Sequence, residues 1–208
     1  MRDEHRAVFE FDRAAGTRTL SMGTPLLRMG VSKRVEMRIA GDGLIHQFSR
    51  GSRALKGMGD TEFGVKVKFH DESKWLPAMG VIPFVGMPSG SALFSNGKMA
   101  PGFKILLAKD LPLGFSASSN LNVTKVAGAD SLFVQKTVTL SIGHELFAGL
   151  SGFWEAFAFA PFDKGTGPAW VYDMGLTRMI GKNAQWDVTW GHRLNQIGPD
   201  QFVQIGLT

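Results

Sequence analysis

The feature of this chain that most constrains its fold is a hydrophobic period of two, repeated over many segments of similar length. In residues 63–69, for example, Phe63, Val65, Val67 and Phe69 alternate with glycine and lysine. One apolar and one polar face is the pattern of a half-buried β-strand, and no long segment offers a competing helical stripe. The sequence therefore predicts an all-β fold.

Twelve segments follow this pattern, and most of them are nine to thirteen residues long. Ordinary soluble strands have about 5–6 residues. A ten-residue strand tilted by about 45° rises by about 23 Å, which is the height of a hydrocarbon layer. We expect the strands at residues 5–13, 17–29, 33–40, 62–70, 76–88, 100–109, 112–124, 131–143, 146–159, 168–180, 183–193 and 200–208.

The predicted connections alternate between short and long. Short turns are expected at residues 30–32, 71–74, 110–111, 143–145 and 181–182, and long connections at 41–61, 89–99, 125–130, 160–167 and 194–199. The first connection, at 14–16, lies on the long side by parity. Outer-membrane barrels have tight periplasmic turns and longer external loops. A Greek-key sandwich gives no reason for this alternation. We therefore expect one domain, residues 1–208, folded as an up-and-down antiparallel transmembrane β-barrel of about 12 strands.

Composition excludes several classes of protein. The chain has no cysteine, which excludes disulfide scaffolds, thiolate zinc sites and cysteine nucleophiles. No stretch approaches 18 uninterrupted apolar residues, so no transmembrane helix is expected. The net charge of +5 comes from scattered basic residues, and no nucleic-acid-binding motif is present. Charges of both signs in residues 1–6, with no apolar segment behind them, predict no secretory signal peptide in this sequence.

In a membrane barrel the polar face of each strand lines the interior. This parity predicts eleven channel-lining residues of mixed charge: Glu36, Arg38, Glu62, Lys66, Lys68, Lys104, Gln135, Glu155, Asp173, Gln185 and Asp187. Facing charges in a narrow barrel often neutralise each other, so a purely structural role is the stronger interpretation for most of them. The near balance of signs predicts no single-sign selectivity filter.

Aromatic residues on or beside the strands predict interfacial girdles, since rings with a polar edge favour the headgroup level. The candidates are Trp75, Trp154, Trp170, Tyr172, Trp186 and Trp190, which ordinary core packing would also explain. Lys136 breaks the pattern, because it shares the apolar parity of its strand and must lie near a rim. Residues 89–99 mix flexible residues with Leu93 and Phe94, and could fold inward as a constriction or form a mobile surface loop.

No catalytic, metal or cofactor site is predicted. The five histidines fall on different strands and turns, and the sequence lacks a nucleophile elbow, a phosphate-binding loop and a dinucleotide fingerprint. One weak alternative is a hydrolase that pairs His192 with Ser151 or Thr189. Strands 76–88 and 146–159 are apolar on both faces, which predicts a partly apolar interior.

Several short runs resemble the motifs of one bacterial outer-membrane family. Residues 25–38 are similar to its "LLRYG…R-E-R" hairpin, residues 57–66 to its "G-x-GD…G-x-K" strand, residues 84–90 to its "P-S/T-G" strand end, and residues 172–177 with 185–187 to its closing hairpin. The family is the transporter family described as "putative meta-pathway of phenol degradation", and the resemblance spans residues 17–208. It implies an outer-membrane barrel that passes small molecules, aromatic ones among them, and it implies no catalytic residues. Strand 200–208 departs from such barrels by lacking a terminal aromatic residue.

Three functions remain open from the sequence. The first is a narrow outer-membrane channel for passive passage of small, aromatic or hydrophobic solutes, with outer-membrane lipid and the barrel-insertion machinery as partners. The second is an outer-membrane lipid hydrolase, and the third is a soluble β-barrel that binds an apolar ligand. Burial separates the first two from the third, because apolar strand faces point outward in a membrane barrel and inward in a soluble one.

Overall fold

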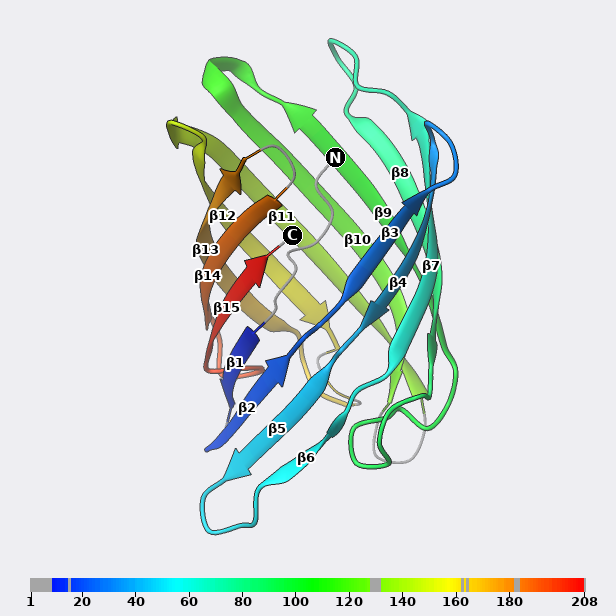
Figure 1. The fold of residues 1–208 in the computed structure, drawn as a ribbon, viewed down its shortest axis with the longest axis vertical. Helices are drawn as coiled ribbons and strands as arrows, with labels where there is room; N and C mark the ends of the chain where they lie inside the picture. The colour runs from blue at the N-terminus through cyan, green and yellow to red at the C-terminus, as the bar shows by residue number, and fades with distance from the viewer. Residues whose placement is uncertain are drawn as a thin grey trace.

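The computed structural model of this chain is all-β, with fifteen strand segments in one antiparallel sheet. It describes residues 9–14, 16–127, 132–161, 163, 165–181 and 184–207. Figure 1 shows the strands tilted against the long axis of the molecule. The strands are β1 (Phe9–Ala14), β2 (Thr17–Met22), β3 (Leu26–Gly30), β4 (Val35–Gly41), β5 (Leu44–Ser49), β6 (Leu55–Met58), β7 (Thr61–His70), β8 (Ala78–Met87), β9 (Ala100–Asp110), β10 (Phe115–Ala127), β11 (Leu132–Phe147), β12 (Leu150–Ala160), β13 (Ala169–Ile180), β14 (Ala184–Arg193) and β15 (Gln201–Leu207).

Neighbouring strands in the sheet follow the order β3-β4-β7-β8-β9-β10-β11-β12-β13-β14-β15-β1-β2-β5-β6. From β7 to β15 every strand pairs with its neighbours in sequence, as expected for an up-and-down meander. β1 pairs on one edge with β15 and on the other with β2, so the two ends of the chain lie side by side in the sheet (Figure 1).

Three strand pairs follow each other along the chain with only short breaks. Residues 23–25 separate β2 from β3, residues 42–43 separate β4 from β5, and residues 59–60 separate β6 from β7. The β2–β5 and β3–β4 ladders share one register without an insertion on either side, and so do the β5–β6 and β4–β7 ladders. The three breaks therefore lie next to one another across adjacent strands.

The long connection expected at residues 41–61 is wrong, because β5 and β6 lie inside it. The alternating pattern is hard to see in the sequence because it changes parity at residues 42–43. On β4 the even-numbered Arg38 is buried, whereas on β5 the odd-numbered Ile45 and Gln47 are among the less exposed residues. Gly43 makes this change possible. Its φ is +66°, and a Cβ there would lie 2.2 Å from the carbonyl oxygen of Met22.

The turn expected at residues 143–145 is also wrong, because β11 continues to Phe147. The chain reverses at Ala148 and Gly149, which have φ values of +46° and +75°. Positive φ at both central residues is the geometry of a tight two-residue hairpin. Ala-Gly lacks the Asn-Gly or Asp-Gly signature of such turns, whereas Gly143 suggested a turn that the structure does not have. Among the described residues, the other turns and loops lie within a few residues of their predicted positions. Residues 128–130 of the connection expected at 125–130 and residue 182 of the turn expected at 181–182 lie outside the described residues.

Candidate functional site

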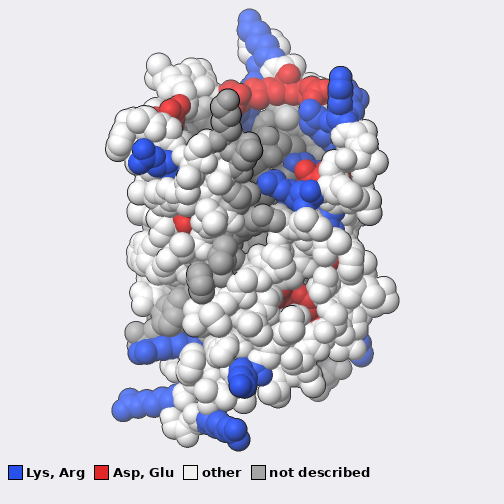
Figure 2. Space-filling model, in the orientation of Figure 1, with Lys and Arg blue, Asp and Glu red and all other residues white. Residues whose placement is uncertain are grey.

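The two faces of the sheet differ in polarity, and the apolar face is the exposed one. On β11, Val134, Val138, Leu140 and Ile142 are 40–54% exposed, while the alternate Thr139 is half-buried. Other strands repeat this pattern with exposed large side chains that include Phe63, Val65, Phe69, Phe103, Leu107, Leu176, Val203, Ile205 and Leu207. Figure 2 shows the charged side chains of the visible face gathered mostly towards its two ends.

An exposed apolar belt of this extent is typical of a surface that meets lipid, because soluble monomers rarely expose large contiguous apolar patches. The soluble barrel considered from the sequence requires the opposite arrangement, with its apolar face inward, and is contradicted by this burial pattern. Among the described residues, no helix is long and apolar enough to cross a membrane.

Lys136 lies on the apolar face, as its parity predicts, and is exposed. It pairs with Ala160, the last residue of β12, and therefore lies near the end of the sheet that bears the connection 161–168. From there its long side chain can reach the polar interface. Lys136 therefore lies near a rim of the sheet, as its place on the apolar face requires.

The opposite face carries the polar side chains. Arg38, Asp173, Thr177, Asp187 and Thr189 are each no more than 5% exposed. The eleven predicted lining residues are all buried or half-buried, and all lie on this face: Glu36, Arg38, Glu62, Lys66, Lys68, Lys104, Gln135, Glu155, Asp173, Gln185 and Asp187. Their role in lining a passage stays a prediction.

The basic members of this set lie together on β4, β7 and β9. Nε of Arg38 is 3.3 Å from Oε1 of Glu36, and Glu36 is directly opposite Lys66 in the β4–β7 ladder. Nζ of Lys104 lies 3.3 Å from Oε1 of Glu62 and 4.8 Å from the ring centre of Phe84. Here opposite charges neutralise each other in pairs, as the structural interpretation of the sequence expected.

The acidic members that form no ion pair with another described residue lie on β12, β13 and β14. Glu155 is directly opposite Asp173, and Asp187 is directly opposite Thr177. The charges that the sequence presented as a mixture are therefore sorted by strand, with the basic residues on one part of the sheet and these acidic residues on another. Sequence parity alone could not reveal this separation.

Apolar side chains also occupy the inner face. Ile82, Phe84 and Leu106 form a buried cluster between β8 and β9. β8 thus carries apolar residues on both faces, as the sequence predicted for residues 76–88. This cluster and the ion pair of Lys104 with Glu62 lie on neighbouring strands, so polar and apolar groups share the same stretch of wall.

Two phenylalanine rings lie flat against the inner wall over glycines of the next strand. A Cβ at Gly175 would be 2.5 Å from the ring of Phe153, and a Cβ at Gly191 would be 2.1 Å from the ring of Phe202. Both pairs are directly opposite in the ladders. The absence of a side chain on each glycine therefore creates the space that each ring occupies.

We expect Gly191→Ala to destabilise the protein by about 1–3 kcal/mol, because overpacking forces the ring of Phe202 from its position. The measurement is the free energy of unfolding by urea in detergent micelles. Gly30→Ala is the matched control, since a Cβ at Gly30 meets no atom within 4 Å. Equal stability of the two variants would contradict the packing described here. Phe202→Ala in the Gly191→Ala background should remove the clash.

Loop 88–99, between β8 and β9, is fastened to the break between β6 and β7. The backbone N–H groups of Gly90 and Asn96 donate to the two carboxylate oxygens of Asp60, at 2.9 and 2.8 Å. Ser91 exchanges hydrogen bonds with Met58, whose N–H donates to Oγ of Ser91 and whose oxygen accepts from the N–H of Ser91. We call this set of contacts the Asp60 latch.

The Asp60 latch joins two motifs that the sequence presented separately. Gly90 of Pro88-Ser89-Gly90 lies so close to residues 57–60 that a Cβ there would be 2.7 Å from the oxygen of Met58. Phe94 and Ser91 pack against Gly57, where a Cβ would be 2.7–2.8 Å from them. Asp60 is not among the residues predicted from the sequence to have a role, although it lies in one family motif and loop 88–99 begins in another.

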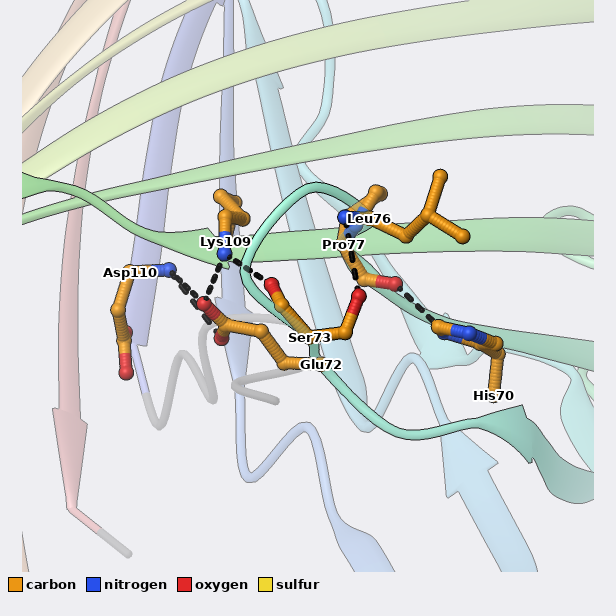
Figure 3. Close-up of polar contacts among 7 residues, drawn as sticks. All are labelled: His70, Glu72, Ser73, Leu76, Pro77, Lys109 and Asp110. Atoms are coloured by element: carbon orange, nitrogen blue, oxygen red, sulfur yellow. Dashed lines mark hydrogen bonds and ion pairs between the residues drawn. The ribbon is translucent and has the colours of Figure 1, made fainter.

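A second network of hydrogen bonds links the β7–β8 turn to the end of β9, at the end of the strands opposite the Asp60 latch (Figure 3). Nζ of Lys109 donates to Oε1 of Glu72 and to the oxygen of Ser73, both at 2.6 Å, and the N–H of Asp110 also donates to Glu72. The hydrogen bond from Lys109 lowers the pKa of Glu72 below its usual value. These groups are partly exposed to solvent, so their contacts order the turns but contribute little to the free energy of folding.

The six predicted girdle residues lie at different heights. Trp75 lies in the β7–β8 connection, and Trp170 lies at the start of β13, near the opposite edge of the sheet. Trp154 and Trp190 share one row, since both pair with Met174. Trp75, Trp154, Trp170 and Trp190 are exposed, whereas Tyr172 and Trp186 are half-buried. Their role at the membrane interface stays a prediction.

The described residues provide little support for a metal site or a hydrolase site. No group of three or more His, Cys, Asp or Glu among them is arranged to hold a metal ion. The hydrolase alternative required His192 beside Ser151 or Thr189. His192 is exposed and stacks on Trp190, whereas Thr189 points to the other face and is 1% exposed. Ser151 also lies on that inner face, so the structure does not bring the proposed pair together.

Comparison with known proteins agrees with this architecture. Residues 6–208 match the family described as "Putative MetA-pathway of phenol degradation". The chain belongs to this family. A comparison with curated proteins finds no match.

Among solved structures, the chain is similar to the COG4313 outer membrane channel from Pseudomonas putida F1. The two share 12% sequence identity and a TM-score of 0.66, over 98% of this chain and 97% of the channel. At this identity the likeness shows a shared fold. The bacterial outer-membrane localisation expected from the sequence is supported by the family, by this fold and by the outward apolar face.

Proposed function

We propose that this protein is an outer-membrane β-barrel that forms a narrow passage for passive movement of small solutes, including aromatic or hydrophobic ones. The observation that carries the proposal is the reversed polarity of the sheet, with large apolar side chains exposed and Arg38, Asp173 and Asp187 buried. Outer-membrane barrels show this arrangement, because lipid contacts the outer face and water or solute the inner one. The barrel-insertion machinery is the partner that such a chain needs to reach the membrane.

The proposed barrel closes with twelve strands. The shared registers support this count, because β2 with β3, β4 with β5, and β6 with β7 then act as three long interrupted strands. The first and last segments of the sheet order, β3 and β6, become halves of strands that are already joined to their neighbours. β1 supports closure in the same way, since it pairs with both β15 and β2.

The proposed passage is narrow. Twelve strands lie between the filled eight-stranded barrels and the open sixteen-stranded porins. Its wall also carries the cluster of Ile82, Phe84 and Leu106, and the latched loop 88–99 lies against Gly57 on the less exposed side of β6. A mixed polar and apolar lining favours small solutes that are partly apolar over large hydrophilic ones.

We expect purified protein in planar lipid bilayers to give small, discrete conductance steps, well below those of a sixteen-stranded porin measured alongside as reference. Folding in each sample is checked by the shift in electrophoretic mobility between heated and unheated protein. A folded sample without any conductance would refute the passage. Conductance as large as that of the porin would refute its narrowness.

A further inference from the structure

A group of carboxylates on the inner face of β12, β13 and β14 takes no part in the ion pairs and hydrogen bonds described above. Glu155 is directly opposite Asp173, whereas Asp187 lies four residue pairs further along the β13–β14 ladder, opposite Thr177. Like charges directly opposite each other destabilise a sheet. Among the described residues no ion pair offsets that cost, and a bound positive group would do so.

Two of these carboxylates and a neighbouring hydroxyl are almost fully buried. Asp173 is 5% exposed, Asp187 is 2% exposed and Thr189 is 1% exposed. Oδ1 of each aspartate and Oγ1 of Thr189 have no hydrogen-bond partner among the described residues. Buried polar groups nearly always have a partner, and leaving one unpaired is costly. Oδ1 of Asp173, next to Glu155 in the ladder, therefore indicates a ligand that donates a hydrogen bond there.

Aromatic rings frame the same carboxylates. Phe153 lies over Gly175, which is two residues from Asp173 on β13, and Phe202 lies over Gly191, which is directly opposite Asp173 on β14. The ring centres of Phe157 and Phe202 are 6.4 Å apart. Asp173 is thus flanked by rings on the same wall. Aromatic faces attract cations, most strongly where water is excluded.

We propose that Glu155 and Asp173, with the rings of Phe153 and Phe202, bind an organic ammonium ion. Its N–H groups supply the missing donors, and its carbon skeleton packs on the rings. A bare metal ion fits less well, because no group of three acidic or histidine residues among the described ones is arranged to hold it. The inference rests on the proposed function, since the interior passage gives the ligand access to Glu155, which is only half-buried.

The test uses the purified protein in detergent micelles and isothermal titration calorimetry with benzylammonium. We expect saturable binding, and binding at least about tenfold weaker in Asp173→Asn, because the substitution removes the charge that strengthens the hydrogen bond to the ammonium ion. Asp110→Asn is the matched control, since Asp110 is exposed at the β9–β10 turn. It should bind as the native protein does. Benzyl alcohol, which has the same ring without the charge, should not bind measurably.

Several results would overturn the proposal. These are equal binding of benzylammonium and benzyl alcohol, equal affinity in Asp173→Asn and the native protein, or complete displacement by an equal concentration of sodium ions. If Asp173→Asn does not fold, Glu155→Gln replaces it, with the same expected loss. The outcome is separate from that of the bilayer experiment. Binding without conductance would refute the passage alone, and conductance without binding would refute the ammonium site alone.

Discussion

Leu140→Arg is expected to destabilise the protein in a lipid bilayer by about 2–4 kcal/mol, the cost of an arginine on the lipid face of a barrel at mid-depth. Leu140 lies on the apolar face of β11 and is 54% exposed. It pairs with Ser119 of β10 and Ala156 of β12, both in the interior of their strands. The measurement is urea-induced unfolding from phospholipid vesicles, followed by tryptophan fluorescence.

Val134→Arg is the matched control, because Val134 lies on the same strand and the same face. It pairs with Lys125 and lies beyond the last β11–β12 pair, near the end of the sheet where Lys136 is found. An arginine there can reach the headgroups, so we expect a cost of only about 0–1 kcal/mol. Equal costs at the two positions would contradict the depth that the registers assign, and negligible costs at both would contradict lipid contact.

The alternation of apolar and polar residues was sufficient to predict the fold class and the orientation of the faces. It depends only on local parity, and parity is conserved along an uninterrupted strand. It failed at residues 41–61, where Gly43 has a positive φ and the parity restarts. It also failed at Ala148 and Gly149, because the tight turn there arises from backbone geometry without its usual residue signature.

The candidate site was predictable only in part for the same reason. Parity placed Glu155 and Asp173 on the inner face, but their direct pairing depends on which strands are neighbours and in what register. The fit of Phe202 over Gly191 requires that register too. A sequence shows which side of a strand a residue occupies, whereas contacts between strands need the ladder itself.

The Asp60 latch is the clearest contact that local patterns could not predict, because Asp60 binds Gly90 and Asn96, which lie 30 and 36 residues further along the chain. Asp60 is 8% exposed, and its carboxylate accepts from both backbone groups. The sequence left open whether residues 89–99 form a constriction or a mobile surface loop. The latch now allows the two interpretations to be separated by experiment.

Asp60→Ala is expected to release loop 88–99. Loss of hydrogen bonds to a buried carboxylate, at about 1.5–3 kcal/mol, should raise the population of the undocked loop by about 10–100-fold. Lys98, exposed within the loop, should then become a fast trypsin site. If the docked loop narrows the passage, single-channel conductance should rise in the same variant, because the obstacle moves away from the wall at Gly57.

Asp71→Asn provides the control for this experiment, since Asp71 is an exposed carboxylate at the other edge of the sheet, paired with Lys68 and Arg34. It should change neither cleavage at Lys98 nor conductance. Faster cleavage in Asp60→Ala with unchanged conductance would identify residues 88–99 as a surface loop and contradict the constriction. Unchanged cleavage would contradict the latch itself, because the hydrogen bonds of Asp60 would then not be what holds the loop in place.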